Sequence, residues 1–164
     1  MLNGPVRSVQ QRLGWETLEI GLWLNETAVF DPAVVSLRED LDQLGVIVRG
    51  CNGFPQTSFH APVVKRSVYR PHWGESDRLR YTKRLAEVLV RIGHGPVREI
   101  STVPIGHQEL SSEILPVAIK NLLDLVDFLS ALENESGIHV MVDLEITERM
   151  QERMIQQQER FLEV

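Results

Sequence analysis

The sequence has a single cysteine and no hydrophobic run that approaches the length of a membrane span. One cysteine, Cys51, cannot form an internal disulfide, and its place beside an apolar run predicts a small buried thiol in a reducing compartment. A spanning helix needs roughly 20 apolar residues, and the amino terminus lacks the charged-then-apolar form of a signal peptide. We therefore expect a cytoplasmic protein without a membrane span.

Positive charge is also scarce, because 17 lysines and arginines face 23 aspartates and glutamates and give a net charge of -6. Proteins that bind nucleic acid normally show a basic excess or a basic face, so we expect no nucleic-acid partner. A local basic patch remains compatible with this charge. With 164 residues, 43% of them hydrophobic, the chain is expected to form one globular domain over 1–164.

Apolar strand patterns alternate with helical patterns along the chain. Residues 1–17 are predicted as loop or weak helix. Strands are predicted at 18–24, 46–48, 99–105 and 138–144, and helices at 31–44, 76–92, 113–135 and 147–164, the last with a thin apolar face and doubtful packing. This order predicts an α/β fold with a parallel sheet over 18–145 and helices outside it. Half of an eight-stranded barrel and a small open sheet both satisfy the pattern.

A long stretch without helical or strand periodicity, 52–73, follows the second predicted strand. It contains Phe54, Phe59, Tyr69 and Trp73, and disordered segments are normally poor in aromatic residues. We therefore predict a functional loop. Its bases, including Lys65, Arg66 and Arg70, suit an anionic group such as phosphate or carboxylate, while surface bases beside packed aromatics remain the alternative.

Polar residues follow each predicted strand, where parallel folds place their chemistry. They are Asn25 and Glu26, then Asn52 and His60, then His107, Gln108 and Glu109, and finally Asp143 and Glu145. Histidine and carboxylate from separate strands suit a divalent metal such as manganese, zinc or magnesium. For each histidine, the alternative interpretation is an ordinary surface or core residue that binds no metal. For Asp143 and Glu145, the alternative interpretation is that they are carboxylates at a strand end, which contact water or the start of the next helix.

The second strand and its loop resemble a known family, the EboE proteins. The matching segments are 21–24, 52–55, 59–60, 64–65, 68–71, Trp73, 78–79, 81–82 and 100–106. EboE proteins are described as metabolite traffic proteins and are similar to xylose-isomerase-like sugar phosphate isomerases and epimerases. Gln56 and Thr57 depart from the family pattern, and segments matching the family's first strand and the second half of its barrel are absent, which predicts a truncated relative.

The resemblance implies a half TIM-type barrel that handles a small biosynthetic metabolite, with His60 and Asp143 as metal ligands. In this hypothesis Asn52, Lys65, Arg70 and His107 bind substrate. If the protein is catalytic, a metal would hold adjacent sugar-like oxygens and Glu145 would move the proton. The alternative is a non-catalytic binding or partner module, or an inactive truncated relative. A half barrel leaves sheet edges uncovered, so we expect a homo-oligomer or a complex with other Ebo proteins.

Overall fold

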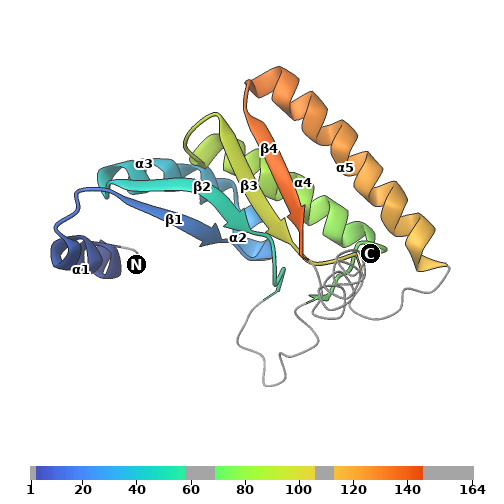
Figure 1. The fold of residues 1–164 in the computed structure, drawn as a ribbon, viewed down its shortest axis with the longest axis horizontal. Coiled ribbons are helices and arrows are strands. Elements are labelled where there is room, and N and C mark those ends of the chain that lie inside the picture. The colour runs from blue at the N-terminus through green and yellow to red at the C-terminus, as the bar shows by residue number, and fades with distance from the viewer. Residues whose placement is uncertain (1–2, 58–68, 106–112, 146–164) are drawn as a thin grey trace, which may run out of the picture.

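The fold is an α/β arrangement built on one parallel sheet of four strands (Figure 1). The computed structural model describes residues 3–57, 69–105 and 113–145. The strands are β1 (Leu18–Trp23), β2 (Val46–Asn52), β3 (Val97–Thr102) and β4 (His139–Leu144), and they lie side by side in the order β1-β2-β3-β4. All three pairings are parallel. The predicted parallel sheet with alternating helices is therefore confirmed.

One helix precedes β1, the others connect successive strands, and they differ widely in length. They are α1 (Asn3–Leu13), α2 (Glu26–Phe30), the 3-10 helix η1 (Pro32–Ser36), α3 (Leu37–Gln43), α4 (Ser76–Ile92) and α5 (Ile114–Ser136). No helix in the described part of the chain is both long enough and apolar enough to cross a membrane. The helix predicted at 147–164 lies outside the described residues.

The helix expected over 31–44 forms as two consecutive pieces, η1 and α3, and a separate short helix, α2, precedes it. The Asn25 side chain accepts a hydrogen bond from the Ala28 N–H at 2.9 Å and so begins a separate short helix upstream. Pro32 has no N–H with which to continue that helix. Asp31 instead caps η1 by accepting the Ala33 N–H at 2.8 Å, which confirms the predicted aspartate-proline start.

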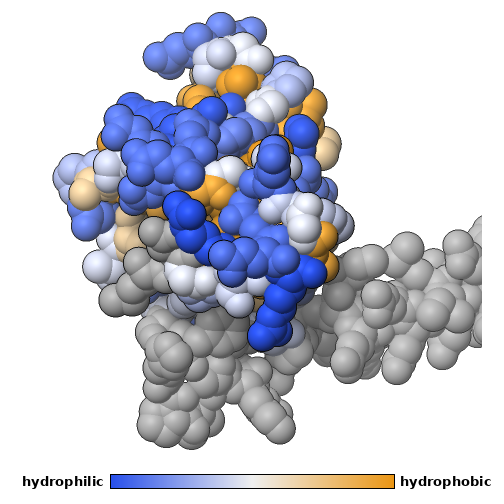
Figure 2. All heavy atoms as spheres, turned by 90° about the vertical axis from the view of Figure 1, so that its left-hand side faces the viewer, coloured by the Kyte–Doolittle hydropathy of each residue, from blue (hydrophilic) through white to orange (hydrophobic). Residues whose placement is uncertain are grey.

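Helix α1 forms over residues predicted as loop or weak helix, and tertiary contacts explain its stability. Val6 is buried against the main hydrophobic cluster. The Gln10 side chain donates hydrogen bonds to the carbonyl oxygens of Leu44 and Glu16, at 2.8 and 2.9 Å. Gly14, with a φ of 67°, ends the helix in a conformation that favours glycine. From the side on which α1 lies, the surface is largely hydrophilic with separate apolar residues (Figure 2).

The helices that follow β1 cover one face of the sheet, and α4 supplies most of that cover (Figure 1). Six apolar side chains of α4 have no exposed surface: Tyr81, Leu85, Ala86, Val88, Leu89 and Ile92. Burial alternates along the strands, so that Val48 and Ile100 face the helices while Glu99 and Met141 are exposed on the other face. We call this second face, which carries Glu19, Gly21, Arg49, Val97, Glu99, His139, Met141 and Asp143, the open face.

A β-bulge adjusts the middle of the sheet. Ile20 pairs with Val48 but Gly21 pairs with Gly50, so Arg49 is the additional residue. The bulge returns Cys51 to the buried face, where burial raises the pKa of its thiol to about 12. The prediction of a buried thiol is therefore confirmed, and its thiolate form is suppressed at neutral pH.

Leu85→Ala should destabilise the fold, because this side chain is completely buried between α4 and the sheet. We expect a loss of about 2–5 kcal/mol in the free energy of unfolding, measured by urea denaturation. Leu123→Ala is the matched control, since Leu123 on α5 is 60% exposed and should change stability by less than about 0.5 kcal/mol. Equal effects of the two substitutions would contradict the assignment of α4 as the core helix.

The open face should drive association between copies of the chain. Parallel sheets are normally covered on both faces, yet Val97 and Met141 are 45% and 42% exposed here. We expect light scattering to give a mass above that of a monomer, and Met141→Lys to lower it, whereas Leu123→Lys on the outside of α5 should not. A wild-type chain that is monomeric at every concentration would contradict association through the open face. Equal effects of the two lysine substitutions on the mass would contradict it as well.

Candidate functional site

The carboxyl ends of the four strands bring one row of residues together on the open side of the sheet. Trp23 pairs with Asn52, Asn52 pairs with Ser101, and Ser101 pairs with Asp143. Each residue is at or next to the last position of its strand. The row therefore combines an indole, an amide, a hydroxyl and a carboxylate at the edge where parallel folds bind ligands.

An open groove of ≈ 440 Å³ runs beside this row. Its lining residues are Gly21, Leu22, Trp23, Gly50, Cys51, Asn52, Glu99 and Ser101. Gly21 and Gly50 are register partners, and with no side chain on either residue the groove can reach the backbone of β1 and β2. The volume is within the range of sites for small molecules.

Two carboxyl groups meet at one end of the groove. The carboxyl group of Glu99 on β3 interacts with that of Asp143 on the neighbouring strand β4, and this interaction raises the pKa of Glu99. Neighbouring carboxylates repel one another, and a bound cation would relieve that repulsion. We call Glu99 and Asp143 the carboxyl pair.

Asn52 is held in place at the start of the loop that follows β2. Its Oδ1 accepts hydrogen bonds from the Phe54 N–H at 3.1 Å and from the Ser101 hydroxyl at 3.4 Å. The next loop residue also reaches back to the row, because the Trp23 indole donates to the Pro55 carbonyl at 2.8 Å. These contacts orient both Asn52 and Trp23 at the groove.

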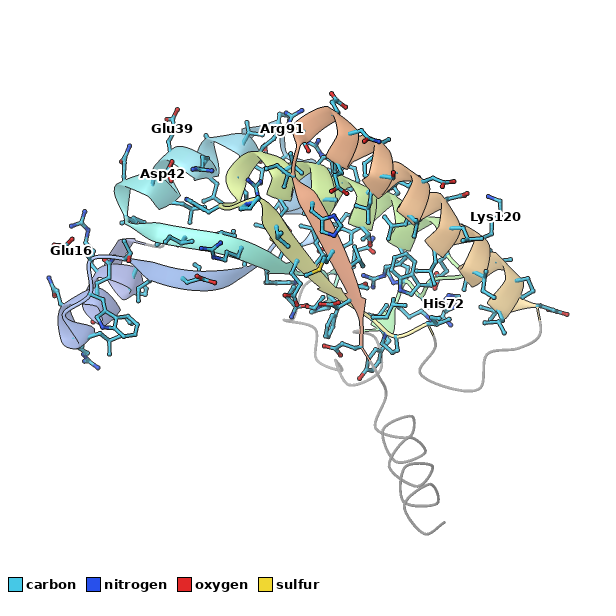
Figure 3. The ribbon with its side chains drawn as sticks, turned by 45° about the horizontal axis from the view of Figure 1, so that its top comes forward. Glu16, Glu39, Asp42, His72, Arg91 and Lys120 are labelled. Atoms are coloured by element: carbon cyan, nitrogen blue, oxygen red, sulfur yellow. The ribbon has the colours of Figure 1, made fainter. Side chains whose placement is uncertain are left out.

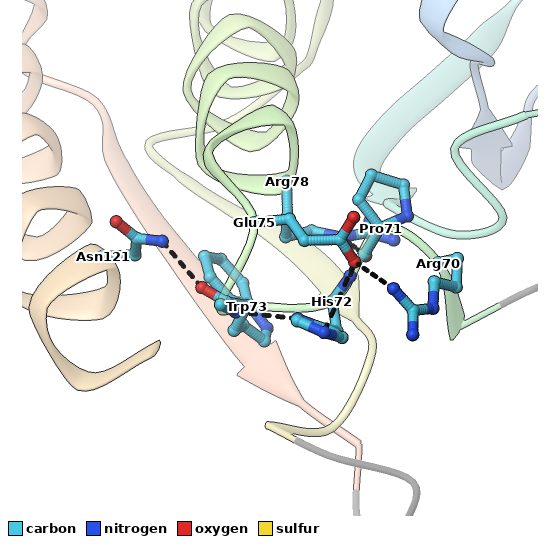
Figure 4. Close-up of polar contacts among 8 residues, drawn as sticks. Arg70, Pro71, His72, Trp73, Glu75, Arg78 and Asn121 are labelled. Carbon is cyan, nitrogen blue, oxygen red and sulfur yellow. Dashed lines mark hydrogen bonds and ion pairs between the residues drawn. The ribbon is translucent and has the colours of Figure 1, made fainter. Parts of the chain in front are cut away.

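Arg70 lies near the start of α4 and is not among the residues that line the groove (Figure 4). Its guanidinium contacts the Glu75 carboxylate at 3.1 Å and remains 67% exposed. Glu75 also accepts the His72 N–H at 2.9 Å. His72 lies toward the carboxyl ends of the strands, whereas Asp42 and Glu16 lie at the other end of the molecule (Figure 3). Among the described residues Arg70 is paired with Glu75, which leaves fewer of its donors for an anion.

Glu145, the predicted catalytic residue, follows β4 directly. Its backbone N–H donates to the Thr102 carbonyl at 3.0 Å, which fixes the chain beside the end of β3. Partial burial raises the pKa of its carboxyl group.

The structure brings together two of the predicted site residues, Asn52 and Asp143, in the same row. Three others, His60, Lys65 and His107, lie outside the described residues. Sequence reasoning missed Glu99, Ser101 and Trp23. The sequence offers no distinctive signal for Glu99, which begins the predicted strand 99–105; in the structure the alternation Arg98-Glu99-Ile100 places it on the face opposite the core.

The carboxyl pair fits some of the predicted metals and not others. Magnesium and manganese prefer oxygen ligands, and magnesium often binds through one or two carboxylates while keeping its waters. Zinc sites usually take three or four protein ligands, mostly nitrogen or sulfur. Over residues 3–57, 69–105 and 113–145 no group of three or more histidine, cysteine or acidic side chains has metal-binding geometry. The described residues therefore fit a hydrated magnesium or manganese ion better than zinc.

Comparison with known proteins does not assign the chain to a family. A scan against protein-family models finds no match. A search of curated proteins finds no significant match either. The resemblance to EboE proteins therefore stays a prediction.

Asp143→Asn should lower the pKa of Glu99. Contact with Asp143 raises that pKa in the folded chain, so stability falls as the pH rises from the ordinary carboxyl value through the raised one. In the variant this loss of stability should disappear. The measurements are a carbon NMR titration of the Glu99 carboxyl and urea denaturation from ~pH 4 to ~pH 8.

The control for this titration is Glu19→Gln, because Glu19 lies on the same face but pairs with Arg49 at 3.1 Å. It should leave the titration of Glu99 unchanged. An unaltered Glu99 titration in Asp143→Asn would show that the two carboxyl groups do not interact.

Proposed function

We propose that this chain is an EboE-like protein that binds a small polar metabolite in the groove on the open face, together with a magnesium or manganese ion at the carboxyl pair. The single observation that carries this proposal is the position of Glu99 and Asp143 beside a groove at the carboxyl ends of parallel strands. Asn52 and Ser101 add an amide and a hydroxyl next to the pair, which suits a ligand rich in hydroxyl groups.

The strand order supports the half-barrel part of the proposal. In a TIM-type barrel each strand pairs with the next one in the sequence, and all crossover helices lie outside. The order β1-β2-β3-β4 and the helices on one face agree with the first half of that plan. The open face would then be the barrel interior, which explains why it carries charged and small residues as well as apolar ones.

A catalytic version of this proposal assigns proton transfer to Glu145. A bound divalent ion would polarise a carbonyl oxygen and stabilise the adjacent negative charge, as in sugar phosphate isomerases. Glu145 would take the proton from the neighbouring carbon, and its raised pKa suits that role. Asn52 would orient the substrate hydroxyl groups.

One observation favours binding without catalysis as the second candidate. Among the described residues the cation has only two carboxyl ligands, and Arg70 already contacts Glu75 rather than the groove. A binding module needs only the groove and its polar row. His60, Lys65 and His107 stay predicted contributors to the catalytic version.

The chain should bind manganese with one-to-one stoichiometry through the carboxyl pair. We expect Glu99→Gln and Asp143→Asn each to weaken the affinity by roughly tenfold or more, since charged contacts contribute about 1.5–3 kcal/mol each. Isothermal titration calorimetry measures both the affinity and the stoichiometry. Glu19→Gln, on the same face, serves as the control and should bind as the wild type does.

The catalytic version is tested with sugar phosphates in heavy water. Exchange of a substrate carbon-bound proton, followed by proton NMR, should require manganese and should be abolished in Glu145→Gln. Manganese binding without exchange would leave the binding module as the function. Wild-type chain that binds no manganese would exclude the cation from the proposal.

A further inference from the structure

Arg78, in the first turn of α4, is a charged residue with no exposed surface. Burial lowers the pKa of its guanidinium to about 10, so the side chain remains charged at neutral pH. No carboxylate of the described residues forms a salt bridge with it, and its Nη2 is buried without a hydrogen-bond partner there. A buried charge with an unsatisfied donor is costly, and an apolar residue would often serve stability better.

The other two nitrogens of Arg78 bind backbone carbonyls from two separate segments. Nη1 donates to the Gly53 carbonyl at 2.7 Å, directly after β2. Nε donates to the Pro71 carbonyl at 2.8 Å, shortly before α4 (Figure 4). A single guanidinium thus joins the described start and the described end of the connection between β2 and α4.

Gly53 links Arg78 to the groove. Its N–H donates to the Ser101 carbonyl at 2.7 Å, so this residue is held by β3 on one side and by Arg78 on the other. A Cβ at this position would lie 2.8 Å from the Ser101 carbonyl oxygen, which only glycine avoids. The neighbouring residue is Asn52, whose side chain lines the groove.

The same connection also reaches Trp23. The Asn52 amide accepts the Phe54 N–H, and the next residue, Pro55, accepts the Trp23 indole N–H. Displacement of the Gly53 carbonyl would therefore move the backbone that orients both groove residues. Arg78 itself lies on the helix side of the sheet and does not line the groove.

We propose that Arg78 is a positioning residue for the groove, which holds the Gly53 carbonyl and thereby sets the orientation of Asn52 and Trp23. The proposal rests on the proposed function only in the claim that these two residues contact a ligand. The series of hydrogen bonds and backbone connections from Arg78 through 52–55 to Trp23 does not depend on which ligand binds. Residues that orient ligand-contacting groups typically change affinity by about 10–100-fold when they are replaced.

Arg98 provides a matched control at the opposite end of the sheet. It is 6% exposed and also donates two hydrogen bonds to backbone carbonyls, through Nη1 to Leu89 and through Nε to Gly95. It therefore resembles Arg78 in burial and bonding. Its contacts join the end of α4 to the start of β3, away from the groove.

The experiment compares Arg78→Met and Arg98→Met in full-length chain that carries 5-fluorotryptophan. Fluorine NMR gives one resonance for each of Trp15, Trp23 and Trp73, assigned with single tryptophan-to-phenylalanine variants. We expect Arg78→Met to shift or broaden the Trp23 resonance and Arg98→Met to leave it unchanged. Both variants should lower the urea midpoint, which separates positioning from general destabilisation.

Arg78→Lys tests the same link if Arg78→Met fails to fold, because lysine keeps the charge but cannot donate in the same forked geometry. A Trp23 resonance at the wild-type position in folded Arg78→Lys or Arg78→Met would overturn the proposal. An equal Trp23 shift in Arg98→Met would also overturn it, since the effect would then be global.

Manganese affinity gives the functional readout. We expect the Arg78 variants to bind manganese at least about tenfold more weakly than Arg98→Met does, because Gly53 bonds to Ser101, which pairs with Asp143 of the carboxyl pair. Wild-type chain without manganese affinity would contradict the proposed cation site, and the Trp23 resonance would still decide whether Arg78 positions the groove. Unchanged affinity in an Arg78 variant with a shifted Trp23 resonance would overturn the link to ligand binding.

Discussion

The packing of α4 against the middle of the sheet is the interaction on which the rest of the structure depends. Its buried face is unbroken from Tyr81 to Ile92, and every apolar side chain on that face is removed from water. Side chains of the same helix also form hydrogen bonds with the backbone just after two of the strands. The Tyr81 hydroxyl donates to the Leu24 carbonyl after β1, and Arg78 donates to the Gly53 carbonyl after β2. One helix thus supplies both the hydrophobic core and the polar anchors of the candidate site.

The two faces of the sheet have opposite roles because one is covered and the other is not. On the covered face, apolar burial stabilises the strands. On the open face, burial is low enough for Glu99, Asp143 and the Glu19–Arg49 ion pair to keep contact with water. The parallel arrangement then ends all four strands at one edge, so residues far apart in the sequence meet without any further folding requirement.

The sequence predicts the sheet and the main helices well because burial periodicity determines them. It also predicts Asn52 and Asp143 as site residues, since a polar residue at the end of an apolar strand can be recognised from the sequence alone. It does not predict Glu99 as a site residue, because a charged residue in the middle of a strand has the same pattern as any exposed position. Only the register between β3 and β4 brings Glu99 to Asp143. The short helix α2 was missed because its Asn25 cap precedes the Asp31 cap of η1 by only a few residues.

The candidate site is built from features that each oppose stability. The carboxyl pair places two acidic groups in contact, Arg78 buries a charge, and glycine at position 53 increases the conformational entropy of the unfolded chain. All three are connected, because Arg78 holds Gly53, Gly53 bonds to Ser101, and Ser101 pairs with Asp143. Costly features that are scattered through a fold need no common explanation. Costly features joined by hydrogen bonds and strand pairing at one edge of a sheet are expected where a protein binds a ligand, since the ligand can offset the repulsion that the folded chain alone retains.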